Sequence, residues 1–85
     1  MVVGVQFTGS LPAHATQRWF TFNWPAAWNV VWTVVSTSPV PGAPQVEWEV
    51  AVERATASTI TFWITIHNLT ANLTNIEARY AITNI

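Results

Sequence analysis

The sequence predicts an all-β fold, a six-stranded antiparallel β-sandwich in one small domain over residues 1–85. Apolar and polar residues alternate along several stretches, as they do in half-buried strands. Short links rich in Pro, Gly, Ser, Thr or Asn separate these stretches, and no window favours a helix over a strand. The expected strands are Val2–Thr8, Arg18–Phe22, Trp28–Ser36 (or from Asn29), Gln45–Arg54, Ser58–His67 and Asn75–Thr83.

The first two expected strands flank an irregular segment. Gly4 weakens the middle of the first strand, because glycine brings no side chain to the packing of a sheet. Residues 9–17 show no periodicity, which is typical of a loop. In the second strand Phe20 and Phe22 share one face. Pro25 then interrupts the pattern, because proline has no N–H to donate to a β-ladder.

The third expected strand is apolar on both faces. One face of an antiparallel sheet in an isolated domain normally meets water. We therefore expect either a second layer over each face of this strand or a second subunit over one of them. One face carries Trp28, Val30, Trp32 and Val34, and the other carries Val31, Thr33 and Val35.

The last three expected strands alternate more regularly, and their short links predict a meander. In that arrangement we expect Arg79 to meet one of the outward glutamates across strands. The fourth strand has Val46, Trp48, Val50 and Val52 inward and Glu47, Glu49, Ala51 and Glu53 outward. The fifth has Ile60, Phe62, Ile64 and Ile66 inward and Thr59, Thr61, Trp63, Thr65 and His67 outward. The sixth has Ile76, Ala78, Tyr80 and Ile82 on one side.

The composition limits the classes of function. Only 8% of the residues are charged, against about 25% in an ordinary soluble domain, and the chain has no Lys, Asp or Cys. With a net charge of −1 we expect no nucleic-acid partner and no membrane insertion. We expect the surface to be formed mainly by Ser, Thr, Asn and Gln, and much of it also to be covered by other subunits. No signal peptide is expected, and the sequence leaves the compartment open.

Catalysis and metal binding are not expected. Without Cys or Asp, the usual Ser-His-Asp and Cys-His arrangements are absent. Glu47 and Glu49 lie roughly 6–7 Å apart by strand rise, close to the separation in inverting glycosidases. We interpret them as ordinary outward glutamates. His14 and His67 are the only histidines and have no spacing typical of a metal site, so we expect no metal and no cofactor.

Trp63 and His67 are the candidate ligand-binding residues. A sugar ring stacks a patch of C–H groups on an aromatic face, and its hydroxyls need donors and acceptors such as His67, Asn68 and Arg54. The alternative is that Trp63 packs against a loop or another subunit, as most Trp side chains do. The segments Asn68-Leu69-Thr70 and Asn72-Leu73-Thr74 fit the glycosylation sequon, but we interpret both as turn asparagines.

Two parts of the chain resemble the H-type lectins, the snail-agglutinin family. The first part is Phe20-Thr21-Phe22 before Pro25, followed by the apolar strand Val30–Val35. The second part is the tail through Val46–Val52, Phe62, His67-Asn68 and Tyr80-Ala81-Ile82. The resemblance implies a six-stranded sandwich, usually a trimer, that binds N-acetylgalactosamine or galactose-type sugars at the rim between subunits. His67 stands where that family has a sugar-binding histidine. Three features depart from the pattern: residues 9–12 lack the family's acid, Arg54 matches its arginine only with a shift, and the 68–74 link is longer.

Two hypotheses follow from the sequence. The first is a non-enzymatic lectin that binds galactose-type glycans as a homo-oligomer, a trimer by resemblance. The second is a structural or self-assembling interaction module without a sugar ligand, motivated by the two-sided apolar strand and the scarce charge.

Overall fold

The computed structural model describes the whole chain, Met1–Ile85, and contains strands but no helix. The strands are β1 (Val2–Leu11), β2 (Thr16–Phe20), β3 (Trp24–Pro25), β4 (Val30–Ser36), β5 (Val46–Glu53), β6 (Thr59–Asn68) and β7 (Thr74–Ile82). The all-β prediction is confirmed. The protein has no helix long and apolar enough to cross a membrane.

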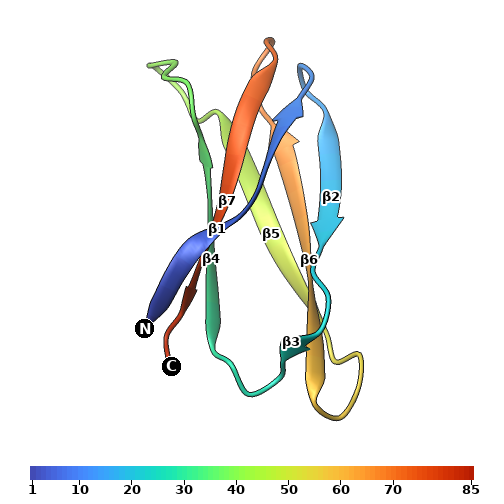
Figure 1. The fold of residues 1–85 in the computed structure, drawn as a ribbon. Coiled ribbons are helices and arrows are strands. Elements are labelled where there is room, and N and C mark those ends of the chain that lie inside the picture. Colours follow the sequence, from blue (N-terminus) through green and yellow to red (C-terminus); the bar gives the residue numbers. More distant parts are fainter.

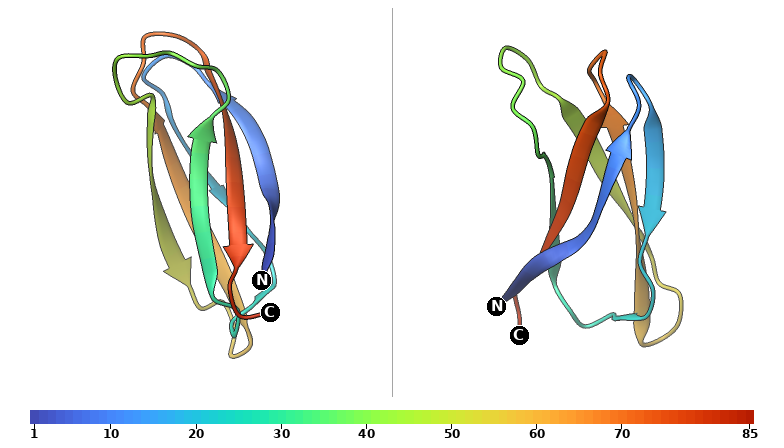
Figure 2. Two further views of the ribbon diagram at one scale, coloured as in Figure 1. Left: turned by 90° about the vertical axis from the view of Figure 1, so that its left-hand side faces the viewer. Right: turned by 45° about the horizontal axis from the view of Figure 1, so that its top comes forward.

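The strands form two antiparallel sheets that face each other (Figures 1 and 2). Sheet I has the order β1-β7-β4. In sheet II, β6 is central, with β5 on one side and both β2 and β3 on the other. The N- and C-termini lie close together at one end of sheet I (Figure 1).

The structure has seven strands where the sequence predicts six. The additional strand is β3, which pairs Trp24 with Ile60 and Pro25 with Thr59. It lies on the same side of β6 as β2, and the two are separated by residues that include Asn23 with a φ of 54°. This left-handed conformation interrupts the extended chain between them. Pro25 is tolerated because β3 is an edge strand, where a missing N–H breaks no ladder.

The core lies between the sheets and uses the faces that the alternation of the sequence predicts. Thr and Ile dominate β6, and their β-branched side chains favour the pleated conformation. Phe62, Ile64 and Ile66 of β6 are buried against Ile76 and Ala78 of β7. The core cluster consists of Leu11, Trp32, Val34, Phe62, Ile64, Ile66, Ile76 and Ala78.

The predicted meander is wrong. β5 pairs with β6 as expected, but β7 pairs with β1 and β4 in the opposite sheet. The chain therefore crosses between the sheets after Asn68. As a result Arg79 lies opposite Val5 and Thr33, and its guanidinium binds Glu77 of its own strand at 2.8 Å instead of a glutamate of β5. Alternation could not reveal this, because β7 turns the same face to the core in either sheet.

Gly4 leaves space for a neighbouring side chain in sheet I, in addition to weakening the packing of its own strand. It lies opposite Tyr80, and a Cβ added to Gly4 would come within 2.6 Å of the Tyr80 hydroxyl oxygen. The missing side chain lets the Tyr80 ring pack edge-on against Trp24, with ring centroids 5.3 Å apart. The glycine thereby links β1 to the aromatic end of the core.

The two faces of β4 have different surroundings. Trp32 and Val34 are buried between the sheets, whereas Val31 and Thr33 are exposed on the outer face of sheet I. Within one chain, therefore, only one apolar face of this strand is covered. On the core-facing side of β5, Trp48 is also partly exposed because β5 is an edge strand.

Candidate functional site

Most of the charged side chains of the chain lie on the outer face of sheet II. Cross-strand register places side chains of β2, β6 and β5 in three rows across this face. Because side chains alternate along each strand, residues two apart occupy successive rows on the same face. The rows are Thr16–His67–Glu47, Arg18–Thr65–Glu49 and Phe20–Trp63–Ala51.

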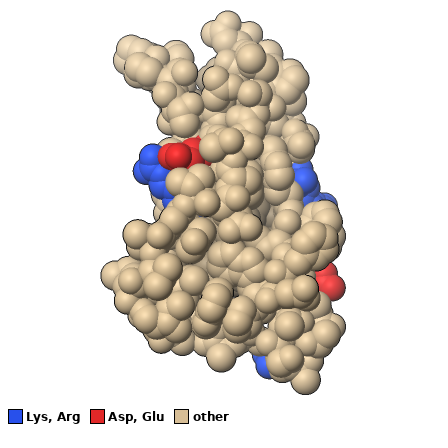
Figure 3. Space-filling model, in the orientation of Figure 1, with Lys and Arg blue, Asp and Glu red and all other residues tan.

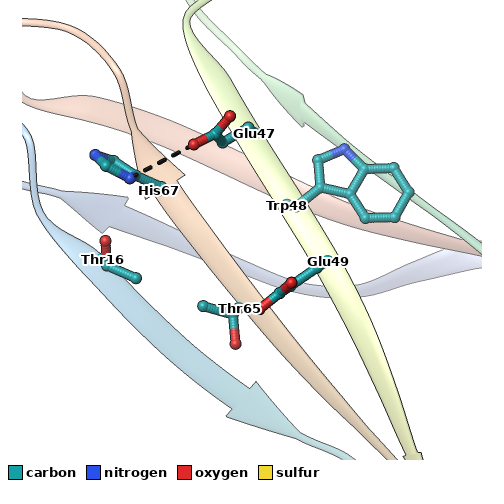
Figure 4. Close-up of a pocket in the computed structure, with 6 residues that line it drawn as sticks. All are labelled: Thr16, Glu47, Trp48, Glu49, Thr65 and His67. Atoms are coloured by element: carbon teal, nitrogen blue, oxygen red, sulfur yellow. Dashed lines mark ion pairs between the residues drawn. The ribbon is translucent and has the colours of Figure 1, made fainter.

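The first two rows enclose a shallow hollow of about 450 Å³, here called the polar hollow. It is lined by Thr16, Glu47, Trp48, Glu49, Thr65 and His67. Figure 4 shows the Trp48 ring directed away from the other five side chains. The lining therefore offers hydroxyl, carboxylate and imidazole groups from three adjacent strands.

His67 and Glu47 face each other at the upper end of this hollow. The distance from His67 Nδ1 to Glu47 Oε1 is 3.7 Å, short enough for an ion pair when the imidazole is protonated (Figure 4). Both side chains remain accessible to solvent, with 38% of the His67 side chain and 67% of the Glu47 side chain exposed. Their polar atoms can therefore bind a ligand that enters the hollow.

A second, smaller hollow of about 220 Å³ continues the first one along β6. It shares Glu49 and Thr65 with the polar hollow and adds Arg18, Ala51 and Trp63. The Arg18 guanidinium carbon lies 5.6 Å from the centre of the Trp63 ring, within the range of a cation–π contact. The two hollows thus lie next to each other over the centre of sheet II, and they are together called the groove below.

Trp63 is packed within its own chain. The Phe20 ring stacks on it with centroids 4.9 Å apart and an angle of 28° between the planes. The indole N–H donates a hydrogen bond of 2.8 Å to Glu53 Oε1. These contacts and Arg18 hold the ring in place and leave it half-buried, so it forms the floor of the groove more than a free stacking surface.

Asn68 and Arg54 do not join His67 at this groove. Asn68 is fully buried, and its side-chain amide is hydrogen-bonded within the protein. Arg54 follows β5 at the opposite end of the β5–β6 hairpin, where it donates hydrogen bonds to the carbonyls of Thr56 and Ala57. Of the four residues expected to bind ligand, the structure places Trp63 and His67 on one face.

Charge on the outer face of sheet II is mainly negative. Three of the four glutamates of the chain, Glu47, Glu49 and Glu53, lie along β5 on this face, and Arg18 is the arginine that shares it. Much of the remaining surface is uncharged, as the view in Figure 3 shows. The protein has no group of three or more His, Cys, Asp or Glu side chains placed to hold a metal ion.

The chain was compared with models of known protein families, with curated proteins and with solved structures. None of them matches.

Phe20, Phe22 and Arg18 belong to this face but were not among the expected binding residues. Phe22 is 70% exposed and Phe20 is 49% exposed, and their rings meet edge to face with centroids 5.0 Å apart. Alternation placed both phenylalanines on one face but could not show that this face is the outer one. Arg18 reaches the groove because it pairs with Thr65, a register that one sequence does not reveal.

Proposed function

We propose that the protein is a non-enzymatic lectin that binds galactose-type glycans, including N-acetylgalactosamine, on the outer face of sheet II. The observation that carries the proposal is the polar hollow, in which Thr16, Glu47, Glu49, Thr65 and His67 converge. The sugar class and the assembly into a homotrimer rest on the H-type lectin resemblance.

The chemistry of the groove suits a sugar. Sugar hydroxyls are donors and acceptors at once, and carboxylates, threonine hydroxyls and an imidazole satisfy both roles. Hydrogen bonds to carboxylates are about twice as strong as neutral ones. A volume of about 450 Å³ lies in the range of roughly 300–1,000 Å³ that is usual for ligand sites. Such binding requires no nucleophile and no metal.

Replacing His67 by alanine is expected to weaken galactose-type binding about tenfold, because a hydrogen bond contributes roughly 0.5–1.5 kcal/mol and tenfold corresponds to about 1.4 kcal/mol. Titration with galactose and N-acetylgalactosamine, followed by tryptophan fluorescence, measures this effect, since Trp63 forms the floor of the groove.

The matched control replaces His14, the second histidine, with asparagine. His14 is exposed in the β1–β2 loop outside the lining of the hollow, and asparagine tolerates its φ of 58°. This variant should bind as the wild type does. A folded protein that shows no saturable response to these sugars would overturn the lectin proposal.

One observation favours the second function, a structural or self-assembling module. The outer face of sheet I has a largely apolar hollow of about 420 Å³ lined in part by Val3, Val5, Val31 and Ala81. Contiguous exposed apolar surface is typical of interaction sites.

Light scattering distinguishes the two functions. We expect a trimer, which agrees with the lectin proposal, whereas large shells or fibres would favour assembly as the function. A monomer at every concentration tested would contradict the oligomer in both proposals.

A further inference from the structure

We infer that the groove on sheet II binds an extended, non-anionic oligosaccharide segment that lies along β6, and not only a single terminal sugar. The inference rests on the proposed sugar binding and adds the length and charge class of the ligand.

The first argument is the length of the site. The row of His67 and the row of Trp63 are four residues apart along β6, which at a rise of about 3.4 Å per residue gives about 14 Å. The two hollows between these rows are adjacent, because both are lined by Glu49 and Thr65. A site of this length is longer than one sugar ring and accommodates a segment of about three linked sugars.

The second argument is the change of chemistry along the groove. Hydrogen-bonding groups dominate around His67 and Glu47, whereas at the other end the exposed ring of Phe20 packs on Trp63 and that of Phe22 packs on Phe20. One sugar ring cannot contact both ends. A short chain can, because one of its sugars presents hydroxyls to the polar hollow while another stacks a C–H face on a phenylalanine.

The third argument is electrostatic. Glu47, Glu49 and Glu53 border one side of the groove along β5, and Arg18 is the single arginine opposite. The other nearby arginine, Arg54, is hydrogen-bonded to backbone carbonyls of the β5–β6 turn. Carboxylates therefore outnumber fixed cations, and like charges in an interface disfavour a partner. Uronates, sialic acids and sulfated sugars should be rejected, and neutral or amine-bearing sugars accepted.

Isothermal titration calorimetry tests the inference with galactose, its linear di-, tri- and tetrasaccharides, and the matching oligogalacturonates. Affinity should rise at least tenfold from the monosaccharide to the trisaccharide and then level off. The trigalacturonate should bind at least tenfold more weakly than neutral trigalactose. Equal affinity for galactose and its trisaccharide, or tighter binding of the uronate, would overturn the inference and leave the lectin proposal standing. Binding of no sugar in the series would overturn both.

Variants identify the two ends of the groove. Phe22→Ala should weaken trisaccharide binding about tenfold and leave galactose binding unchanged, whereas His67→Ala should weaken both. Phe22→Leu keeps an apolar side chain without the ring and should behave like Phe22→Ala. Val40→Ala, an exposed apolar truncation in the link between β4 and β5 and outside every hollow, is the control and should change neither affinity. Equal loss of both affinities in Phe22→Ala, with the fold intact by circular dichroism, would contradict a separate aromatic position.

Discussion

Replacing Asn68 by alanine is expected to lower the free energy of unfolding by about 3 kcal/mol or more. Each buried polar group that loses its partner costs about 1–3 kcal/mol, and this side chain serves several of them at once. A small domain has a total stability of only about 5–15 kcal/mol. The substitution should therefore remove a large share of the stability, although the Asn68 side chain makes no hydrogen bond to a residue of the proposed sugar groove.

Asn68 holds the crossing between the two sheets. Its Nδ2 donates to the carbonyls of Leu11, Pro12 and Asn72, at 3.1, 3.0 and 2.8 Å. Its Oδ1 accepts hydrogen bonds from the backbone N–H of Thr70 at 2.9 Å and from its hydroxyl at 2.8 Å. One side chain thus ties the end of β1 to the segment that carries the chain from sheet II to sheet I. Alanine would remove all of these hydrogen bonds, including the one to the buried carbonyl of Leu11, while the hydroxyl of Thr70 and the carbonyl of Asn72 would keep their bond to each other.

Urea denaturation measures the change, and Asn72→Ala is its matched control. Asn72 lies in the same loop and, like Asn68, stands two positions before a threonine. Its exposed side chain, however, makes no hydrogen bond in the structure. It should change the free energy of unfolding by no more than about 0.5 kcal/mol, as is usual for surface substitutions. If the two variants were equally stable, the structural role of Asn68 would be refuted.

The adjacent pair His67 and Asn68 shows how far sequence reasoning could go. Alternation predicted the strand and its core face, and the burial of Phe62, Ile64 and Ile66 confirms that face. Because neighbouring residues in a strand point to opposite faces, His67 and Asn68 could not both reach one ligand from within the strand. Their proximity in the sequence is therefore misleading. The alternation of side chains along the strand was enough to predict that His67 and Asn68 point to opposite faces of the sheet.

Pairing and register were the features that the sequence could not supply. The placement of β7 in sheet I depends on the crossing loop, whose hydrogen bonds involve residues 57 positions apart, such as Asn68 and Leu11. The contribution of Arg18 to the groove depends on its register with Thr65. Both are long-range properties that leave no local pattern. Residues whose role depends only on their own strand, such as Ile64, were predicted correctly.

Trp32→Ala is expected to lower the free energy of unfolding by about 3–5 kcal/mol, the usual cost of truncating a buried Trp or Phe. Trp32 is only 5% exposed and joins the two sheets at the aromatic end of the core. From β4 it contacts Phe62 of β6, with ring centroids 5.6 Å apart, and Trp24 of β3, at 5.3 Å. Alanine would leave a cavity between the layers that neighbouring rings could fill only in part.

Trp32→Phe separates packing from hydrogen bonding at the same position. The buried indole N–H of Trp32 has no hydrogen-bond partner, so removing it relieves an unfavourable burial while the smaller ring loses some contacts. The net loss should be about 1–2 kcal/mol, well below that of alanine. Guanidinium denaturation followed by far-ultraviolet circular dichroism compares the two variants without depending on tryptophan emission. A phenylalanine variant as unstable as the alanine variant would show that the N–H is satisfied in solution, and that the core at this end is held by a polar contact as well as by the packing of its aromatic rings.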